Sequence, residues 1–247
     1  MQKNKFMTKG LQRFETRLNY FRQDVELVDL LVINKEKIKG TISIVNKADD
    51  GRHPLLNERQ NNANSRALIT RHLRKTVFVS FFKELHEEVS EYFQYVLRQG
   101  SLAGIPGNQL IGEHVFEIKA NTLLMIPDRA GIVDYVTQEI YRKLENEKST
   151  SKLLNKMNKK LALNIPKPTI DDASPYMEIR HIFVHRDGRP DDSFIRKYGF
   201  IQLDSKGRID LKITLINDAY EKIHTLLKMF DDTMISKGFI VDTEIIN

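Results

Sequence analysis

Cysteine is absent from the 247-residue sequence. The chain therefore cannot form disulfides, use a thiolate nucleophile or build a cysteine-based zinc site. No apolar run reaches the roughly 20 residues that a membrane-spanning helix needs. Residues 1–13 are polar and basic, without the apolar segment of a secretory signal. Because the lack of cysteine also suits a reducing compartment, we expect a soluble, cytoplasmic protein that does not enter a membrane.

Familiar catalytic signatures are missing as well. The sequence has neither a GxxxxGK(S/T) phosphate loop nor a GxSxG nucleophile turn. His181 and His185 have the spacing of zinc ligands on a helix, but "HIFVH" lacks the glutamate base of the zincin motif and no third ligand is evident. The sequence therefore predicts no metal ion and no cofactor.

The composition favours a folded protein with a moderate affinity for polyanions. Hydrophobic residues make up 40% of the chain, including 13 phenylalanines, which is enough for a sizeable core. The length suits one large domain or two small ones, and we predict a single domain over 1–247. The net charge of +6 and the pI near 9.3 are compatible with a nucleic-acid partner but do not require one.

Apolar residues recur at helical spacing along most of the chain, which predicts an all-α fold. The predicted elements are helix 11–38, loop 46–65, helix 66–100 ended by Gly100, a helix capped by Asp128 and a short basic helix over 151–164. The aromatic stripe of helix 66–100 could in principle stack on bases. We assign it to the core, because such stripes are usually buried.

Residues that typically start or end a helix divide the C-terminal third of the chain. Ser174 followed by Pro175 predicts a helix start, and Gly188 with Pro190 predicts its end, so we expect a short helix over about 175–186.

Beyond that helix, apolar alternation around "DSKG" predicts a small β-hairpin at about 200–213. Thr214 is then predicted to cap the last helix, which ends at Gly238.

The segment "EIRHIFVHRDGRPDD", residues 178–192, contains two histidines, three arginines and four carboxylates around an apolar trio. Cations near a helix C-terminus are favoured by the helix dipole, so a charged helix end is one interpretation. The other begins from Arg180 and His185, which form an R-x4-H pair. Imidazole transfers protons near neutral pH, and guanidinium binds phosphate oxygens. Together these groups can support metal-free RNA cleavage, in which the 2′-OH of the RNA is the nucleophile.

The stretch "RHIFVHRDGRPDDSF" resembles the signature of the HEPN superfamily: an arginine, a polar residue, three mostly apolar residues and a histidine. Many bacterial members continue with a glycine and acidic residues. The resemblance implies a HEPN-like helical bundle with its core at about 66–238. It also implies a homodimer with paired R-x4-H motifs lining one cleft, and metal-independent endoribonuclease activity on RNA. Many members are toxins or phage-defence effectors, so an antitoxin or another regulatory partner is a further expectation.

On this resemblance Arg180 and His185 are the catalytic pair, and His181 occupies the polar position after the arginine, where the family often has Asn or Asp. Arg186 and Arg189 are the expected RNA-phosphate contacts. Five residues at about 100° each separate Arg180 from His185 by roughly 140° around a helix. A frayed helix end or a second copy across a two-fold axis would bring both groups to one phosphate, and we favour the second copy.

Two other interpretations stay open from the sequence. The chain could be a non-catalytic HEPN-like module that binds RNA or a nucleotide, or that mediates dimerisation. It could also be an ordinary helical interaction protein in which R-x4-H arises by chance.

Overall fold

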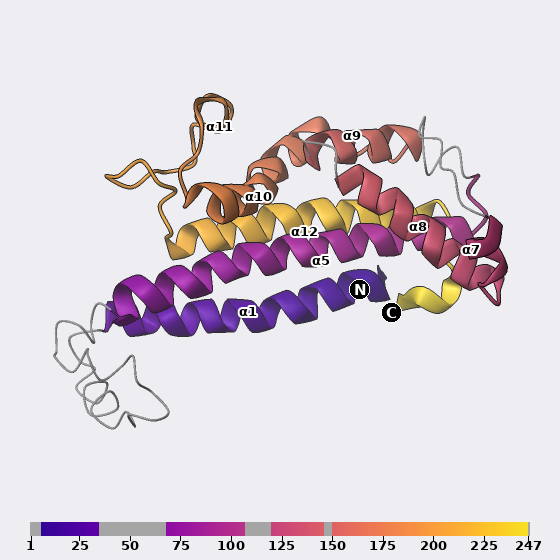
Figure 1. Cartoon of the computed structure of the whole chain (residues 1–247), viewed down its shortest axis with the longest axis horizontal. Coiled ribbons are helices and arrows are strands. Elements are labelled where there is room, and N and C mark those ends of the chain that lie inside the picture. Colours follow the sequence, from indigo (N-terminus) through magenta and orange to yellow (C-terminus); the bar gives the residue numbers. More distant parts are fainter. Residues whose placement is uncertain (1–5, 35–67, 107–119, 146–149, 247) are drawn as a thin grey trace, which may run out of the picture.

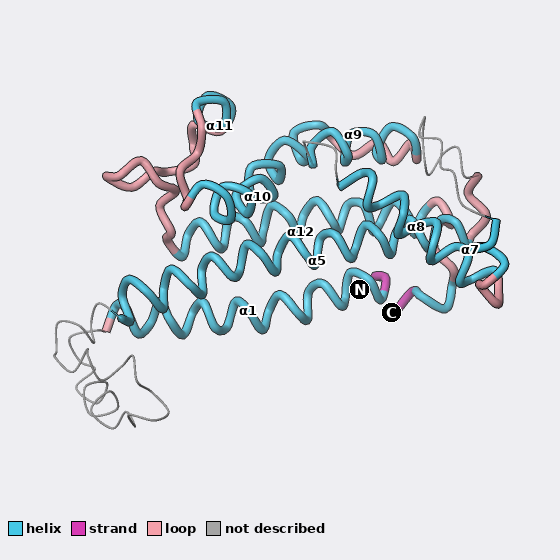
Figure 2. Tube along the Cα trace, in the orientation of Figure 1, coloured by secondary structure: helices cyan, strands magenta, loops and turns pink. Residues whose placement is uncertain are grey.

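The computed structural model describes residues 6–34, 68–106, 120–145 and 150–246. It is mostly helical, as predicted, with eight α-helices in these ranges (Figures 1 and 2). The helices are α1 (Lys9–Ile33), α5 (Arg74–Leu102), α7 (Ala120–Leu124), α8 (Arg129–Glu145), α9 (Thr150–Lys160), α10 (Lys167–Arg186), α11 (Asp192–Lys197) and α12 (Ile213–Ser236). A π-helical turn, η1 (Leu68–Leu73), precedes α5. The predicted loop 46–65 lies outside the described residues. None of the described helices is long and apolar enough to cross a membrane.

Three long helices, α1, α5 and α12, lie side by side, and α10 packs against α5 and α12 (Figure 1). Their apolar stripes form one core, as their spacing predicts. The aromatic stripe of α5 is buried and confirms its assignment to the core: Phe78, Phe81, Phe82, Tyr92 and Phe93. The stripe of α12 is buried as well: Leu215, Ala219, Ile223, Leu226, Leu227, Phe230 and Met234.

A clasp holds the two ends of the described chain together. Strand β1 (Met7–Thr8) pairs antiparallel with β2 (Ile245–Ile246), which follows the 3-10 helix η2 (Asp242–Glu244). Beneath it, the fully buried carboxylate of Asp231 accepts hydrogen bonds from Thr8 N at 2.9 Å, Thr8 Oγ1 at 2.5 Å and the Tyr92 hydroxyl at 3.1 Å. Nothing in the sequence predicted this sheet, because the pairing residues lie at opposite ends of the chain.

The predicted start of α10 was wrong. The helix begins at Lys167 rather than Pro175. Pro168 lies in its first turn, where the N–H that proline lacks would have no partner within the helix anyway. Ser174 is not a cap, because its hydroxyl donates to the Ile170 carbonyl at 2.7 Å inside the helix. Proline normally interrupts a helix interior. Around Pro175, however, the helix is buried against its neighbours, and this packing compensates for the missing hydrogen bond.

The predicted end of α10 is confirmed. Asp187 and Gly188 adopt left-handed backbone conformations, with φ of 49° and 81°. The Gly188 amide donates to the Ile182 carbonyl at 3.1 Å, as in a Schellman motif. An added Cβ at Gly188 would also come within 3.0 Å of the Phe183 ring, so space as well as backbone conformation favours glycine.

The predicted hairpin at 200–213 is reduced to a turn with one isolated antiparallel bridge, Leu203 with Ile209. Gly207, with φ of 70°, and the carboxylate of Asp204 form the turn. The Ile209 amide donates to the Gly188 carbonyl at 2.9 Å and so ties the loop to the end of α10. A two-stranded ribbon is marginal without further strands. The short helix α11, which begins after the N-cap Asp191, was not predicted.

Of the other predicted helix ends, some are confirmed and some were wrong. Asp128 accepts from the Gly131 amide at 2.7 Å at the start of α8, as predicted. Gly238, with φ of 68°, follows the end of α12, also as predicted. Gly100 does not end α5, which continues to Leu102, because helical glycine is only mildly unfavourable where packing holds the helix. Thr214 lies inside the first turn of α12, and Lys212 is the N-cap residue.

Candidate active site

The R-x4-H residues lie on the exposed C-terminal half of α10, which runs antiparallel to α5. Two contacts fix the register of the seam, which is the line of contact between α5 and α10. Lys75 Nζ lies 2.7 Å from Asp187 Oδ1, and the Phe82 and Phe183 rings are 5.8 Å apart. Arg180 lies one turn before Phe183 along α10. It therefore faces the part of α5 that lies one turn beyond Phe82.

Arg180 is half-buried and has no charged partner in the part of the chain that the structure describes. Its Nε is shielded from solvent and makes no hydrogen bond. No carboxylate in the described part of the chain forms an ion pair with it, whereas Arg17 pairs with Glu88 at 3.1 Å and Arg208 with Asp187 at 2.9 Å. A guanidinium held at a surface seam without a counter-ion is available to an external anion.

His181 and His185 lie on the exposed face of α10, in the same half of the helix as Arg180. Their ring centroids are 4.5 Å apart, so the two imidazoles are in contact. Partial burial, followed by the charges of His185 and Arg186, lowers the pKa of His181. The site thus presents two adjacent imidazoles, one of which is biased towards its uncharged form at neutral pH.

Within one chain, Arg180 and His185 leave α10 on different sides of the helix. Because α10 remains helical through Arg186, the roughly 140° between them is preserved. The frayed-end geometry is therefore not adopted.

The two predicted phosphate contacts differ from each other. Arg186 is paired with Asp191 at 2.5 Å. That carboxylate also caps α11 by accepting from the Phe194 amide at 2.8 Å, and these two contacts lower its pKa. Arg189 is exposed and has no ion pair among the described residues. Of these two arginines, Arg189 is the one whose charge is not matched by a carboxylate among the described residues.

His86, on α5, was not identified from the sequence. It is half-buried at the seam with α10. Burial, and after it the positive charge of Arg180, lowers its pKa to about 4. It is therefore uncharged at neutral pH. The sequence carries the residue within a long amphipathic helix but does not show which other helix will lie against it.

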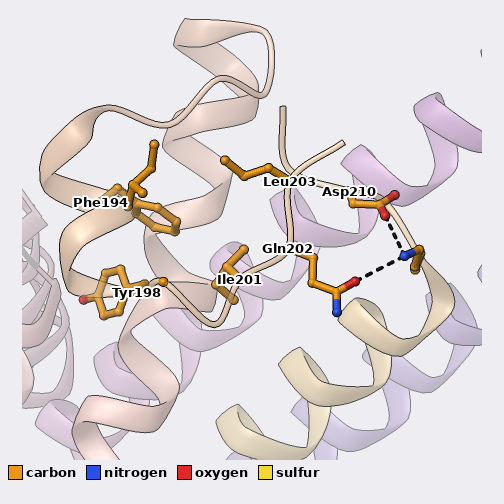
Figure 3. A pocket seen from close by; sticks show the side chains of 9 residues that line it. Phe194, Tyr198, Ile201, Gln202, Leu203 and Asp210 are labelled. Atoms are coloured by element: carbon orange, nitrogen blue, oxygen red, sulfur yellow. Dashed lines mark hydrogen bonds and ion pairs between the residues drawn. The ribbon is translucent and has the colours of Figure 1, made fainter. Parts of the chain in front are cut away.

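A separate shallow pocket lies in the small lobe that follows α10, and it does not include Arg180, His181 or His185. Figure 3 shows Phe194 of α11 and Tyr198, the residue after α11, facing Ile201 and Leu203 of the following loop. Lys212 also lines the pocket, and its Nζ contacts Gln202 at 3.2 Å and Asp210 at 2.8 Å. The pocket is a hollow in the packing of this lobe, away from the histidines.

Among the described residues, no three His, Asp or Glu side chains are grouped closely enough to hold a metal ion. No protein family model, curated protein or solved structure matches the chain.

Proposed function

We propose that the protein is a metal-independent endoribonuclease of the HEPN type. The observation that carries this proposal is Arg180, a half-buried guanidinium without a carboxylate partner among the described residues, on the same half of α10 as two imidazoles in ring contact. A phosphate-binding cation beside proton-transfer groups is what cleavage through the RNA 2′-OH requires.

In the proposed reaction a base removes the proton from the 2′-OH and the 2′-oxygen attacks the adjacent phosphorus. The bond from phosphorus to the 5′-oxygen breaks, and an acid protonates the departing oxygen. The products are a 2′,3′-cyclic phosphate and a 5′-hydroxyl. Arg180 stabilises the negative charge on the phosphorane oxygens, and His185 transfers a proton.

His181 has two possible roles in this scheme. Its lowered pKa favours the uncharged imidazole, which is the form that accepts a proton. A His181→Ala variant that loses as much rate as His185→Ala identifies a second acid–base group, whereas a mild loss identifies a residue that orients His185 through their ring contact.

The separation of Arg180 and His185 around α10 favours a site completed by a second copy of the chain. We propose a homodimer in which the two copies of this segment face one cleft, with Arg189 and, once released from Asp191, Arg186 binding the flanking phosphates. Light scattering at micromolar concentration tests the assembly, and a strict monomer contradicts it.

Incubation of the purified protein with RNA in excess EDTA tests the reaction. We expect cleavage to continue and the products to end in 2′,3′-cyclic phosphates. Arg180→Ala and His185→Ala variants purified in parallel exclude a contaminating nuclease, because they should lose this activity. Cleavage that EDTA abolishes and magnesium restores would contradict the mechanism.

The open geometry of the site within one chain also favours a second candidate, a non-catalytic module that binds RNA. This alternative predicts Arg180-dependent binding without any product, in the monomer and dimer alike.

A further inference from the structure

The imidazole of His86 occupies the position on α5 that faces Arg180. The two contacts that fix the register, Lys75 with Asp187 and Phe82 with Phe183, advance in opposite directions along the two helices. Continuing by one turn places His86 opposite Arg180. Arg180 is also the charged group that acts on the His86 imidazole, as the lowered pKa of His86 reflects.

Elsewhere on α5, carboxylates are placed opposite arginines. Where the helix meets α1, Glu88 lies 3.1 Å from Arg17, and Glu91 lies 3.0 Å from Arg17 and 3.4 Å from Arg13. Carboxylates are abundant next to His86 too, since its helix reads "KELHEEVSE".

The seam with α10 does not follow that pattern. Neither Glu84 nor Glu87 is ion-paired with Arg180 in the described structure, and the Arg180 Nε stays without a partner. Arg180 on α10 is the charged group that acts on the His86 imidazole, and the exposed Lys83 and Glu87 are its neighbours along its own helix. The seam thus holds an uncharged imidazole where a carboxylate would have neutralised the arginine.

We propose that His86 is a positioning residue, which supports the Arg180 guanidinium at the seam without pairing its charge and so keeps it available to a phosphodiester of RNA. This inference rests on the proposed function and assigns the ligand of Arg180. A neutral imidazole can pack against a guanidinium without charge repulsion. A carboxylate in its place would form a partly buried ion pair, and the RNA phosphate would have to displace it.

Replacement of His86 by residues of different charge tests the inference. His86→Gln keeps an uncharged polar side chain of similar reach, and His86→Glu supplies the missing carboxylate. Gln94→Glu makes the same charge change two turns along α5, away from the seam, and serves as the matched control. Arg180→Ala reports on the site itself. Binding is measured by fluorescence anisotropy with a 2′-O-methyl RNA oligonucleotide, which lacks the nucleophile, and cleavage with the unmodified oligonucleotide.

We expect His86→Gln and Gln94→Glu to bind and cleave within about threefold of the parent protein. His86→Glu should bind RNA at least about tenfold more weakly, because a hydrogen-bonded charge contact is lost. It should also cleave about 100-fold more slowly, since the transition-state charge loses its partner. The thermal midpoint of His86→Glu should equal or exceed that of the parent, a readout that separates charge pairing from damage to the fold.

Several outcomes would overturn the inference. A His86→Glu variant with parental binding and cleavage shows that residue 86 does not control Arg180. A His86→Glu variant that fails to fold shows that no cation is there to pair with the carboxylate. A folded His86→Gln variant that is inactive shows that the imidazole itself reacts, which replaces positioning by acid–base catalysis. If Arg180→Ala binds and cleaves like the parent, the proposed function fails, whichever result His86 gives.

Discussion

The clasp that joins the chain ends and the exposed half of α10 differ in whether their charged groups have partners within the described structure. In the clasp, the buried Asp231 carboxylate accepts three hydrogen bonds, all from groups of the same chain. On α10, Arg180 is half-buried and has no ion pair within the described ranges, and His185 is exposed. Buried polar groups that serve the fold are normally satisfied within it. The contrast indicates that the clasp serves stability, and it is the basis of our proposal that the α10 segment binds an external anion.

Substitution of His185 is the strongest test of the α10 side of this comparison. His185→Ala should lower the rate of RNA cleavage by about 10²–10⁴-fold, because a proton-transfer group is removed. It should retain RNA in a filter-binding assay, since Arg180 and Arg189 remain. His224→Ala is the control, because His224 bonds Glu15 at 2.7 Å on the α1–α12 side of the bundle. Equal rates for His185→Ala and the parent would remove the assignment.

Substitution of Asp231 tests the clasp. Asp231→Ala leaves two donors of Thr8 buried without an acceptor, whereas the Tyr92 hydroxyl keeps the Leu227 carbonyl at 3.3 Å. The substitution should lower the free energy of unfolding by about 3 kcal/mol. The neighbouring Asp232 forms an exposed pair with Lys228 at 2.5 Å. Asp232→Ala should therefore change that free energy by less than about 0.5 kcal/mol. Urea unfolding measures both, and equal effects of the two substitutions would show that the clasp is not structural.

The pH dependence of stability tests the burial of His86. The pKa of His86 is lowered from its ordinary value of 6.5 to about 4, by burial first and by Arg180 second. The unfolded chain therefore takes up a proton before the folded one does. The contribution of His86 is complete above pH 6.5 and is lost as the pH falls towards 4, by at most about 2–3 kcal/mol for a half-buried group.

The His86→Gln variant isolates this contribution. Burial raises the pKa of Asp231, which acts in the opposite direction but in both proteins alike, so it cancels in the difference. We expect the parent to lose more free energy of unfolding than the variant between pH 7 and pH 4. Urea unfolding measures both free energies. If they change with pH in parallel, His86 lies in water rather than in the seam.

The smallest expected effect separates the two flanking arginines. Arg189 forms no ion pair with any described residue, whereas Arg186 must first leave Asp191. Arg189→Ala should therefore weaken RNA binding more than Arg186→Ala, and it should reduce the salt slope of the affinity by about 1. Titrations at two salt concentrations measure this difference. A larger loss for Arg186→Ala would show that the pair with Asp191 opens at little cost.

Much of the bundle could be predicted because helix periodicity is local. The apolar stripes of α1, α5 and α12 and the glycine-marked ends of α10 and α12 required no knowledge of their neighbours. The errors arose where packing overrode a local signal. Pro175 is a start signal on its own, yet buried neighbours extend α10 back to Lys167. The alternation at 200–213 found no further strands to support it and gave a single bridge.

By itself the sequence determined which faces of the helices are apolar and which reactive residue types stand together on α10. Tertiary structure decided which of those residues have partners. The antiparallel register of α5 and α10 brings His86 to Arg180, and the approach of α12 to both ends of the chain buries Asp231 beneath the clasp. These contacts join residues far apart in the chain, and their energies depend on burial and counter-charge. Neither quantity exists until the helices have packed.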